Sequence, residues 1–135
     1  MKQILVAEPL HAEALHILRE AGQVAERPGL SEEELAGILP AFDALIVRSR
    51  TRVTAPVLQA GRRLQVIARA GAGVDNIDIA EATRRGVLVL NAPGANAVAV
   101  AEHTLGLILA LARRIPEADA SMHSGRWEKA RFAGV

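Results

Sequence analysis

The chain has 135 residues, half of them hydrophobic and 23% charged, with a net charge of +1 and no cysteine. This length suits one domain with a substantial core, and the balanced charge and scarce aromatic residues give no reason to expect a nucleic-acid partner. Without cysteine the chain can form no disulfide, thiolate nucleophile or cysteine-ligated metal site.

Short apolar blocks separated by helical patterns predict a parallel sheet. The expected strands cover residues 4–7, 23–26, 44–47, 64–68 and 87–90, and the second is polar enough to lie at an edge. The expected helices cover residues 10–21, 31–40, 55–60 and 78–85. Strands that alternate with helices in this way form right-handed βαβ units. Five of them favour an α/β, flavodoxin-like doubly wound sheet with strand order 2-1-3-4-5.

Residues that favour helix ends stand at the expected boundaries. Ser31, followed three residues later by Glu34, predicts a capping box, and Asp78 predicts a similar cap at the start of its helix. Thr54 is a candidate cap for the helix that contains Pro56 in its first turn. These signals support the helix assignments independently of the apolar pattern.

A glycine-bearing turn follows the fourth expected strand. Residues 69–76 read RAGAGVDN, and the backbone N–H groups of such a strand-to-helix turn can hold an anion. The sixth position counted from Gly71 is Asn76, so a dinucleotide-binding G-x-G-x-x-G is incomplete here. The alternative is that Gly71 and Gly73 merely permit a tight turn.

Polar segments end the strands where doubly wound sheets bind ligands. Arg48 and Ser49 follow the third strand, and a guanidinium beside a hydroxyl suits recognition of a carboxylate or phosphate. The alternative for this segment is a solvated basic loop. Asn96 follows the fifth strand and could serve only as the N-cap of the next helix.

Two other classes of site find little support. A receiver domain shares the expected topology but needs adjacent acids after the first strand and an aspartate after the third. Glu8 stands alone at the first of these places, and Arg48 occupies the second. Asp75 and Asp78 fit a turn and a cap better than a metal site, so no metal is expected.

The C-terminal part differs in kind, because residues 97–113 are apolar on almost every side of the expected helix. A helix of this composition belongs inside a larger structure, and one small sheet has limited room to enclose it. We expect His103 to be a hydrogen-bonded interior histidine. The longest apolar segment, residues 105–112, is too short to span a membrane, and we expect a cytoplasmic protein. Pro116 predicts the start of a further helix that ends near His123.

Several segments, in order along nearly the whole chain, resemble the D-2-hydroxyacid dehydrogenases. The resemblance lies in residues 47–51, 69–78, 91–96, 101–104, 111–116, 120–122 and 125–128. It implies a flavodoxin-like substrate-binding domain in residues 1–96, followed by crossing and dimerisation helices in residues 97–135. The family's NAD-binding domain, with its G-x-G-x-x-G and its catalytic Arg, Glu and His, would lie beyond the last residue.

The same resemblance implies roles for individual residues. Backbone N–H groups of the glycine turn would bind the carboxylate of a small anionic 2-hydroxy or 2-oxo acid. The residues that would contact this substrate are Arg48, Ser49, Arg69, Ala72, Gly73, Val74 and Asn96, of which Arg69 is the weaker candidate. Ala72 and Asn96 would also approach the nicotinamide cofactor. No catalytic residue is expected in this chain, which would bind no cofactor alone, whereas the full-length parent would bind NAD.

Two hypotheses follow from the sequence. The chain is either a catalytically inactive piece of an oxidoreductase, truncated before the cofactor domain, or a free-standing anion-binding or interaction module. In either case the apolar helix of residues 97–113 is expected to form a homodimer, because it would otherwise leave a large apolar surface exposed.

Overall fold

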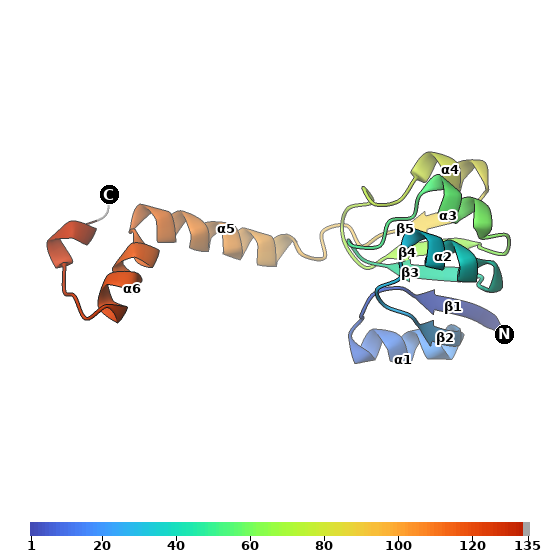
Figure 1. The fold of residues 1–135 in the computed structure, drawn as a ribbon, viewed down its shortest axis with the longest axis horizontal. Coiled ribbons are helices and arrows are strands. Elements are labelled where there is room, and N and C mark those ends of the chain that lie inside the picture. The colour runs from blue at the N-terminus through green and yellow to red at the C-terminus, as the bar shows by residue number, and fades with distance from the viewer. Residues whose placement is uncertain (134–135) are drawn as a thin grey trace. The chain divides into compact units, whose positions relative to one another are not determined.

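The computed structural model describes residues 1–133, which divide into two compact units with a boundary between Ala95 and Asn96 (Figure 1). The strands of the first unit are β1 (Lys2–Val6), β2 (Gly22–Glu26), β3 (Ala44–Val47), β4 (Val66–Arg69) and β5 (Leu88–Leu90). Its helices are α1 (Ala12–Ala21), α2 (Glu32–Ile38), η1 (Leu39–Ala41), α3 (Ala55–Ala60) and α4 (Ile79–Arg84). The second unit contains α5 (Ala97–Ala112), α6 (Ile115–His123) and η2 (Lys129–Phe132).

The five strands form one parallel sheet in the order β2-β1-β3-β4-β5, which confirms the predicted topology. The polar strand β2 lies at an edge, as expected. In the centre, Leu45 of β3 pairs with Leu5 of β1 on one side and with Ile67 of β4 on the other. Because all strands run in one direction, the segments that follow β1, β3 and β4 meet at the same edge of the sheet.

Helices cover both faces of the sheet. The helices α2, α3 and α4 lie on one face and α1 on the other (Figure 1). Successive residues of a strand point to opposite faces, so Leu5 joins the larger cluster while Ile4 and Val6 join the smaller one. Fully burying each leucine of the larger cluster contributes roughly 1.5–3 kcal/mol, so this face supplies much of the unit's stability.

The three residues predicted as helix caps all occupy N-cap positions, and two of them make capping hydrogen bonds. Ser31 makes both hydrogen bonds of a capping box, and the Asp78 carboxylate accepts the backbone N–H of Glu81 at 2.9 Å. Thr54 occupies the N-cap position of α3, as predicted, but its side chain makes no capping bond. Its hydroxyl donates instead to Glu32 at 2.9 Å, a residue of α2 that lies 22 positions earlier in the chain.

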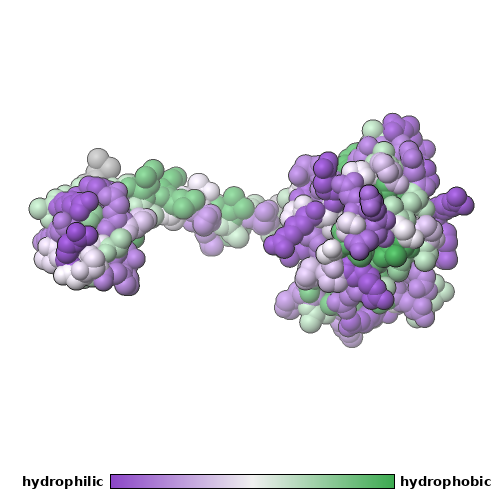
Figure 2. All heavy atoms as spheres, in the orientation of Figure 1, coloured by the Kyte–Doolittle hydropathy of each residue, from purple (hydrophilic) through white to green (hydrophobic). Residues whose placement is uncertain are grey.

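The apolar helix α5 is present as predicted, but no residue of it is buried within the described chain. Leu107, Leu109 and Leu111 expose 58%, 60% and 81% of their surface, and Figure 2 shows hydrophobic residues along this helix. The expectation of an interior His103 is wrong, because the residue is exposed like its neighbours. Among residues 1–133 no helix is long and apolar enough to cross a membrane. The cytoplasmic location stays a prediction.

The rest of the second unit is held by a cluster of charged and aromatic side chains. The Arg114 guanidinium pairs with Glu117, donates to the backbone oxygen of Arg131 at 2.8 Å and lies over the Phe132 ring. Ser121 is buried and donates to the Glu128 carboxylate at 2.8 Å. These contacts join α6 to η2.

Candidate functional site

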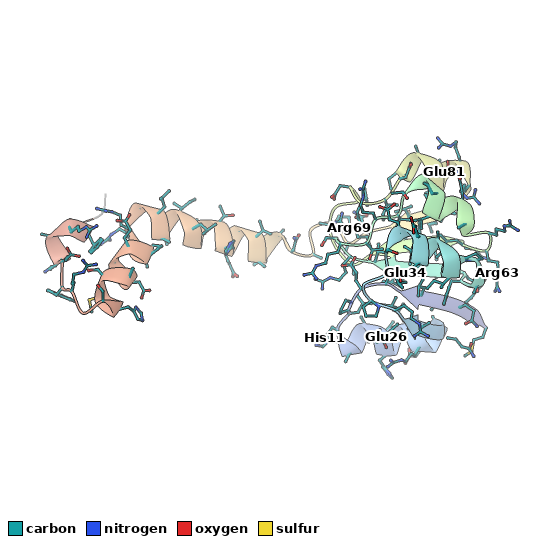
Figure 3. All side chains as sticks on the ribbon, viewed as in Figure 1. His11, Glu26, Glu34, Arg63, Arg69 and Glu81 are labelled. Atoms are coloured by element: carbon teal, nitrogen blue, oxygen red, sulfur yellow. The ribbon has the colours of Figure 1, made fainter. Side chains whose placement is uncertain are left out.

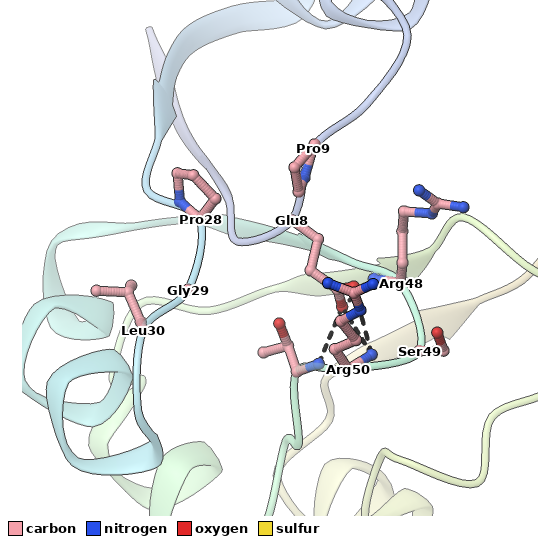
Figure 4. A pocket seen from close by; sticks show the side chains of 9 residues that line it. Glu8, Pro9, Pro28, Gly29, Leu30, Arg48, Ser49 and Arg50 are labelled. Atoms are coloured by element: carbon pink, nitrogen blue, oxygen red, sulfur yellow. Dashed lines mark hydrogen bonds between the residues drawn. The ribbon is translucent and has the colours of Figure 1, made fainter.

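The loops that follow β1, β2 and β3 enclose a cavity of about 550 Å³ at the carboxyl edge of the sheet (Figure 4). Arg48 and Ser49 both line this cavity, together with Glu8, Pro9, Pro28, Gly29, Leu30, Arg50 and Thr51. This is the place where doubly wound sheets bind ligands. The two residues predicted after β3 therefore line a concavity, and both remain exposed to solvent.

A buried carboxylate, Glu8, organises the loop after β3. Only 7% of Glu8 is exposed, and its side chain accepts the backbone N–H groups of Arg48 at 2.8 Å, Thr51 at 2.9 Å and Arg50 at 3.2 Å. Burial raises the pKa of Glu8, but these backbone donors lower it more, and the net pKa lies below its ordinary value. Glu8 is thus an ionised residue inside the cavity wall.

The Arg69 guanidinium lies beneath the glycine turn. It donates to the Asp75 carboxylate at 2.6 Å, and this bond lowers the pKa of Asp75. A Cβ atom at Gly73 would stand 2.8 Å from both Arg69 Nη1 and Asp75 Oδ1, so a larger residue there would have to displace the ends of these two side chains and disturb their ion pair. The structure therefore gives Arg69, the weaker substrate candidate, a partner within the turn itself, and the side chain is only 10% exposed.

Three consecutive backbone donors of the glycine turn have no acceptor within the described part of the chain. The N–H of Ala70 bonds to Val47 and that of Gly71 to Arg69. By contrast, no residue in the range 1–133 accepts a hydrogen bond from the N–H groups of residues 72–74. Successive unpaired N–H groups in a turn form an anion-binding concavity. The three residues predicted to bind a carboxylate through their backbones therefore have donors available for it.

Asn76 ties the glycine turn to the loop after β3. Its side-chain amide donates to the carbonyl oxygens of Arg48 at 2.8 Å and Thr51 at 2.6 Å. On the other side of the turn, the Asn91 amide donates to the carbonyl oxygen of Ala72 at 2.6 Å. The turn is therefore held from both sides, with its backbone N–H groups left open.

Asn96 does not join the other predicted site residues within the first unit. It is the first residue of the second unit and occupies the N-cap position of α5, where its side chain makes no capping bond. Its proposed nearness to substrate and cofactor stays a prediction. Within the described part of the chain, no three His, Cys, Asp or Glu side chains gather closely enough to hold a metal ion.

Sequence reasoning missed Glu8 and Asn76 as parts of this site. The sequence places Glu8 at the carboxyl end of the first strand and tests it as a receiver-domain acid, and it shows Asn76 where a third glycine would stand, but it assigns neither residue a contact. A polar residue directly after a buried strand was the one available signal for Glu8. The contacts that give these two residues their roles span 25 to 43 positions of the chain.

Residues 4–132 match the family model of the D-isomer specific 2-hydroxyacid dehydrogenase catalytic domain. The chain therefore belongs to this family. A relative from Archaeoglobus fulgidus named D-3-phosphoglycerate dehydrogenase is 49% identical over 98% of the chain. The chain spans about a quarter of that relative's length, since the match covers 25% of it.

Solved structures agree in fold. A protein from Thermus thermophilus is 34% identical and superposes with a TM-score of 0.89, covering 98% of this chain and 45% of its own. A 3-phosphoglycerate dehydrogenase from Entamoeba histolytica, solved with NAD⁺ bound, is 30% identical with a TM-score of 0.73. That match covers 83% of this chain and 39% of the Entamoeba chain.

Proposed function

We propose that this chain is the substrate-binding part of an NAD-dependent D-2-hydroxyacid dehydrogenase that interconverts 3-phosphoglycerate and 3-phosphohydroxypyruvate, a step toward serine. The family membership and the name of the Archaeoglobus relative support the reaction class and the substrate. The observation that carries the proposal is the set of N–H groups at residues 72–74 that have no acceptor within residues 1–133, in a turn that Asn76 ties to the loop bearing Arg48 and Ser49.

In this proposal the chain's own residues bind and orient the substrate. The N–H groups of residues 72–74 receive its carboxylate, because unpaired donors in a turn favour an anion over a neutral group. Arg48 and Ser49 contact the remainder of the molecule, where a guanidinium suits a phosphate or a second oxygen. Asn76 links the glycine turn to the loop after β3, and Asn91 links the same turn to the segment after β5.

When bound to the full-length protein, NAD would supply the acceptor for the hydride that leaves the C2 carbon of the substrate. This chain can supply only one margin of that cofactor's site, because G-x-G-x-x-G does not occur in its sequence. Ala72 fits such a margin, since its small side chain leaves the backbone of the turn accessible. We expect the chain alone to oxidise no NADH with 3-phosphohydroxypyruvate, and robust turnover by pure protein would contradict this.

Calorimetric titration with 3-phosphoglycerate tests the binding role. We expect Arg48→Ala to weaken affinity about tenfold, the effect of losing a charged hydrogen bond worth about 1.4 kcal/mol. Arg62→Ala is the control, because Arg62 is exposed and lies just before β4, at the opposite end of the sheet. Equal affinities for the Arg48→Ala variant and the unchanged chain would contradict the proposed site.

A free-standing anion-binding module, the second hypothesis from the sequence, would also bind the acid and transfer no hydride. The coding sequence that follows Val135 separates the two hypotheses. A G-x-G-x-x-G in that sequence, after a strand and before a helix, supports the dehydrogenase. A stop codon in the native gene supports the module.

We also propose that the chain forms a homodimer through residues 97–113. The exposed leucines of α5 support this, because a contiguous apolar surface of this kind usually marks an interface. Sedimentation equilibrium should show a dimer that Leu107→Glu dissociates. Ile17→Glu is the control, since Ile17 is 60% exposed on α1, outside the proposed interface. A clean monomer at high concentration would contradict the proposal.

A further inference from the structure

Two buried carboxylates lie at opposite ends of the strands of the sheet. Glu8 follows β1 at the carboxyl edge and Asp43 precedes β3 at the amino edge, and each is 7% exposed. Asp43 accepts the N–H of Gln3 and pairs with the Arg63 guanidinium. Asp43 therefore has the cationic partner that a buried acid usually requires. This partner, Arg63, lies at the opposite end of the sheet from Arg69 (Figure 3).

Glu8 is compensated differently. Within residues 1–133 no arginine or lysine side chain forms an ion pair with it, although Arg48 and Arg50 are close in the fold. Its carboxylate accepts hydrogen bonds from backbone donors, as the dashed lines in Figure 4 show. Backbone N–H groups that converge in this way form an anion-binding turn. In this protein the turn is filled by the chain's own carboxylate.

We propose that Glu8 is a positioning residue whose carboxylate fills the anion-binding turn of residues 48–51, holds Arg48 and Ser49 at the cavity, and thereby leaves the glycine turn to receive the substrate's carboxylate. The second half of this statement rests on the proposed function. The first half concerns only the conformation of the loop and stands without any ligand.

The carbonyl side of the same turn is held by Asn76. The Asn76 amide donates to the carbonyl oxygens of Arg48 and Thr51, while Glu8 accepts the N–H groups of these same two residues. Residues 48–51 are thus fixed from both sides by contacts with distant parts of the chain. Loss of Glu8 would leave part-buried donors unpaired, which favours rearrangement of the turn, and Asn76 would transmit that change to the glycine turn.

Amide hydrogen exchange, measured by NMR, tests the role of Glu8 without a ligand. Exchange at Arg48, Arg50 and Thr51 should accelerate at least tenfold in Glu8→Ala and less in Glu8→Gln, which keeps one acceptor oxygen. Exchange at Ser49 should change little, because no residue in the described range accepts its N–H. The control Asp43→Asn should accelerate exchange at Gln3 and leave the turn of residues 48–51 unchanged.

Chemical rescue separates an anion-filled turn from general destabilisation. Acetate should restore slow exchange at Arg48 and Thr51 in Glu8→Ala, by occupying the vacated turn, and should have no effect on the unchanged chain. If Glu8→Ala does not fold, the comparison of Glu8→Gln with Asp43→Asn decides. The proposal is overturned if these variants alter the turn equally, if exchange there is unaffected by either Glu8 variant, or if acetate restores nothing.

Binding of 3-phosphoglycerate gives the last measurement. Glu8→Gln should bind it at least tenfold more weakly than the unchanged chain, while Asp43→Asn should bind it with unchanged affinity. An unchanged chain that binds none would remove the proposed function, and the exchange measurements would still decide whether Glu8 holds the turn. Accelerated exchange with full affinity would overturn the positioning role.

Discussion

In the sheet unit Leu5, Leu45 and Ile67 are completely enclosed, whereas in the helical unit Leu107 and Leu111 expose more than half of their surface. Both units contain comparable apolar side chains, so the difference is one of architecture. A sheet covered on both faces encloses side chains within 95 residues, but a single helix that is apolar on all sides cannot cover itself. Apolar side chains therefore stabilise the sheet unit by forming its core, whereas in the helical unit they leave an exposed apolar surface.

The largest expected effect tests this difference with one substitution in each unit. Leu45→Ala should lower the free energy of unfolding of the sheet unit by about 3–4 kcal/mol, because it opens a cavity in a closed core. Leu107→Ala should change it by less than about 0.5 kcal/mol in dilute solution, where the chain is monomeric and the Leu107 side chain is exposed to water. Urea denaturation followed by circular dichroism measures both, and comparable losses would remove the distinction between the units.

The second prediction compares polar contacts. Asn76→Ala should lower the free energy of unfolding of the sheet unit by about 2 kcal/mol, because it removes two hydrogen bonds to carbonyl groups between the two loops of the site. Glu117→Gln, which removes an exposed ion pair with Arg114 in the helical unit, should change stability little. The same denaturation experiment applies. A larger loss of stability from Glu117→Gln than from Asn76→Ala would show that the exposed ion pair contributes more than the hydrogen bonds between the two loops.

Glycine-to-alanine substitutions should have opposite signs in the two units. Gly73→Ala should destabilise by about 1 kcal/mol, because the new Cβ meets Arg69 and Asp75 at 2.8 Å. Gly106→Ala should stabilise α5 by about 0.5–1 kcal/mol, since a Cβ there meets nothing within 4 Å and alanine favours a helix. Thermal melts of both variants would show the signs, and a stabilising Gly73→Ala would contradict the crowding inferred for the turn.

The smallest effect is expected from pH. The pKa of Glu8 is lowered because backbone donors outweigh its burial, and that of Asp43 is lowered chiefly by the N–H of Gln3. A carboxyl whose pKa is lower in the folded state adds stability above its ordinary pKa, and this stability is lost as pH falls through the folded pKa. Melting temperatures should therefore decline below about pH 4.5, the ordinary value for Glu8. The decline should be shallower in Glu8→Gln, and an identical pH profile would argue against this assignment.

Features determined by neighbouring residues could be predicted from the sequence. The apolar blocks that became β1, β3 and β4 were recognisable because strands of a parallel sheet are buried on both faces and leave no polar alternation. The capping roles of Ser31 and Asp78 depend on donors three residues away, so they too are local. The strand order was predicted because five strands that alternate with helices favour the flavodoxin-like arrangement.

Features determined by distant residues could not be predicted in the same way. The Glu8 carboxylate reaches a loop 40 positions later, and the Thr54 hydroxyl finds Glu32 only because α2 and α3 pack together. The available N–H groups of residues 72–74 were expected from a family resemblance, yet the contacts of Asn76 and Asn91 that hold the turn open had no local signal. A side chain's partner depends on which strands become neighbours, and that information is absent from a short window of sequence.

The two edge strands have a consequence for how copies of this chain can meet. A long, flat and apolar edge would invite another chain to extend the sheet, but β5 is only three residues long and β2 carries the exposed polar residues Gln23 and Glu26. Strand pairing between molecules is therefore disfavoured at both edges. As concentration rises, we expect the chain to gain helix-to-helix contacts through α5 and no intermolecular β-sheet band in its infrared spectrum.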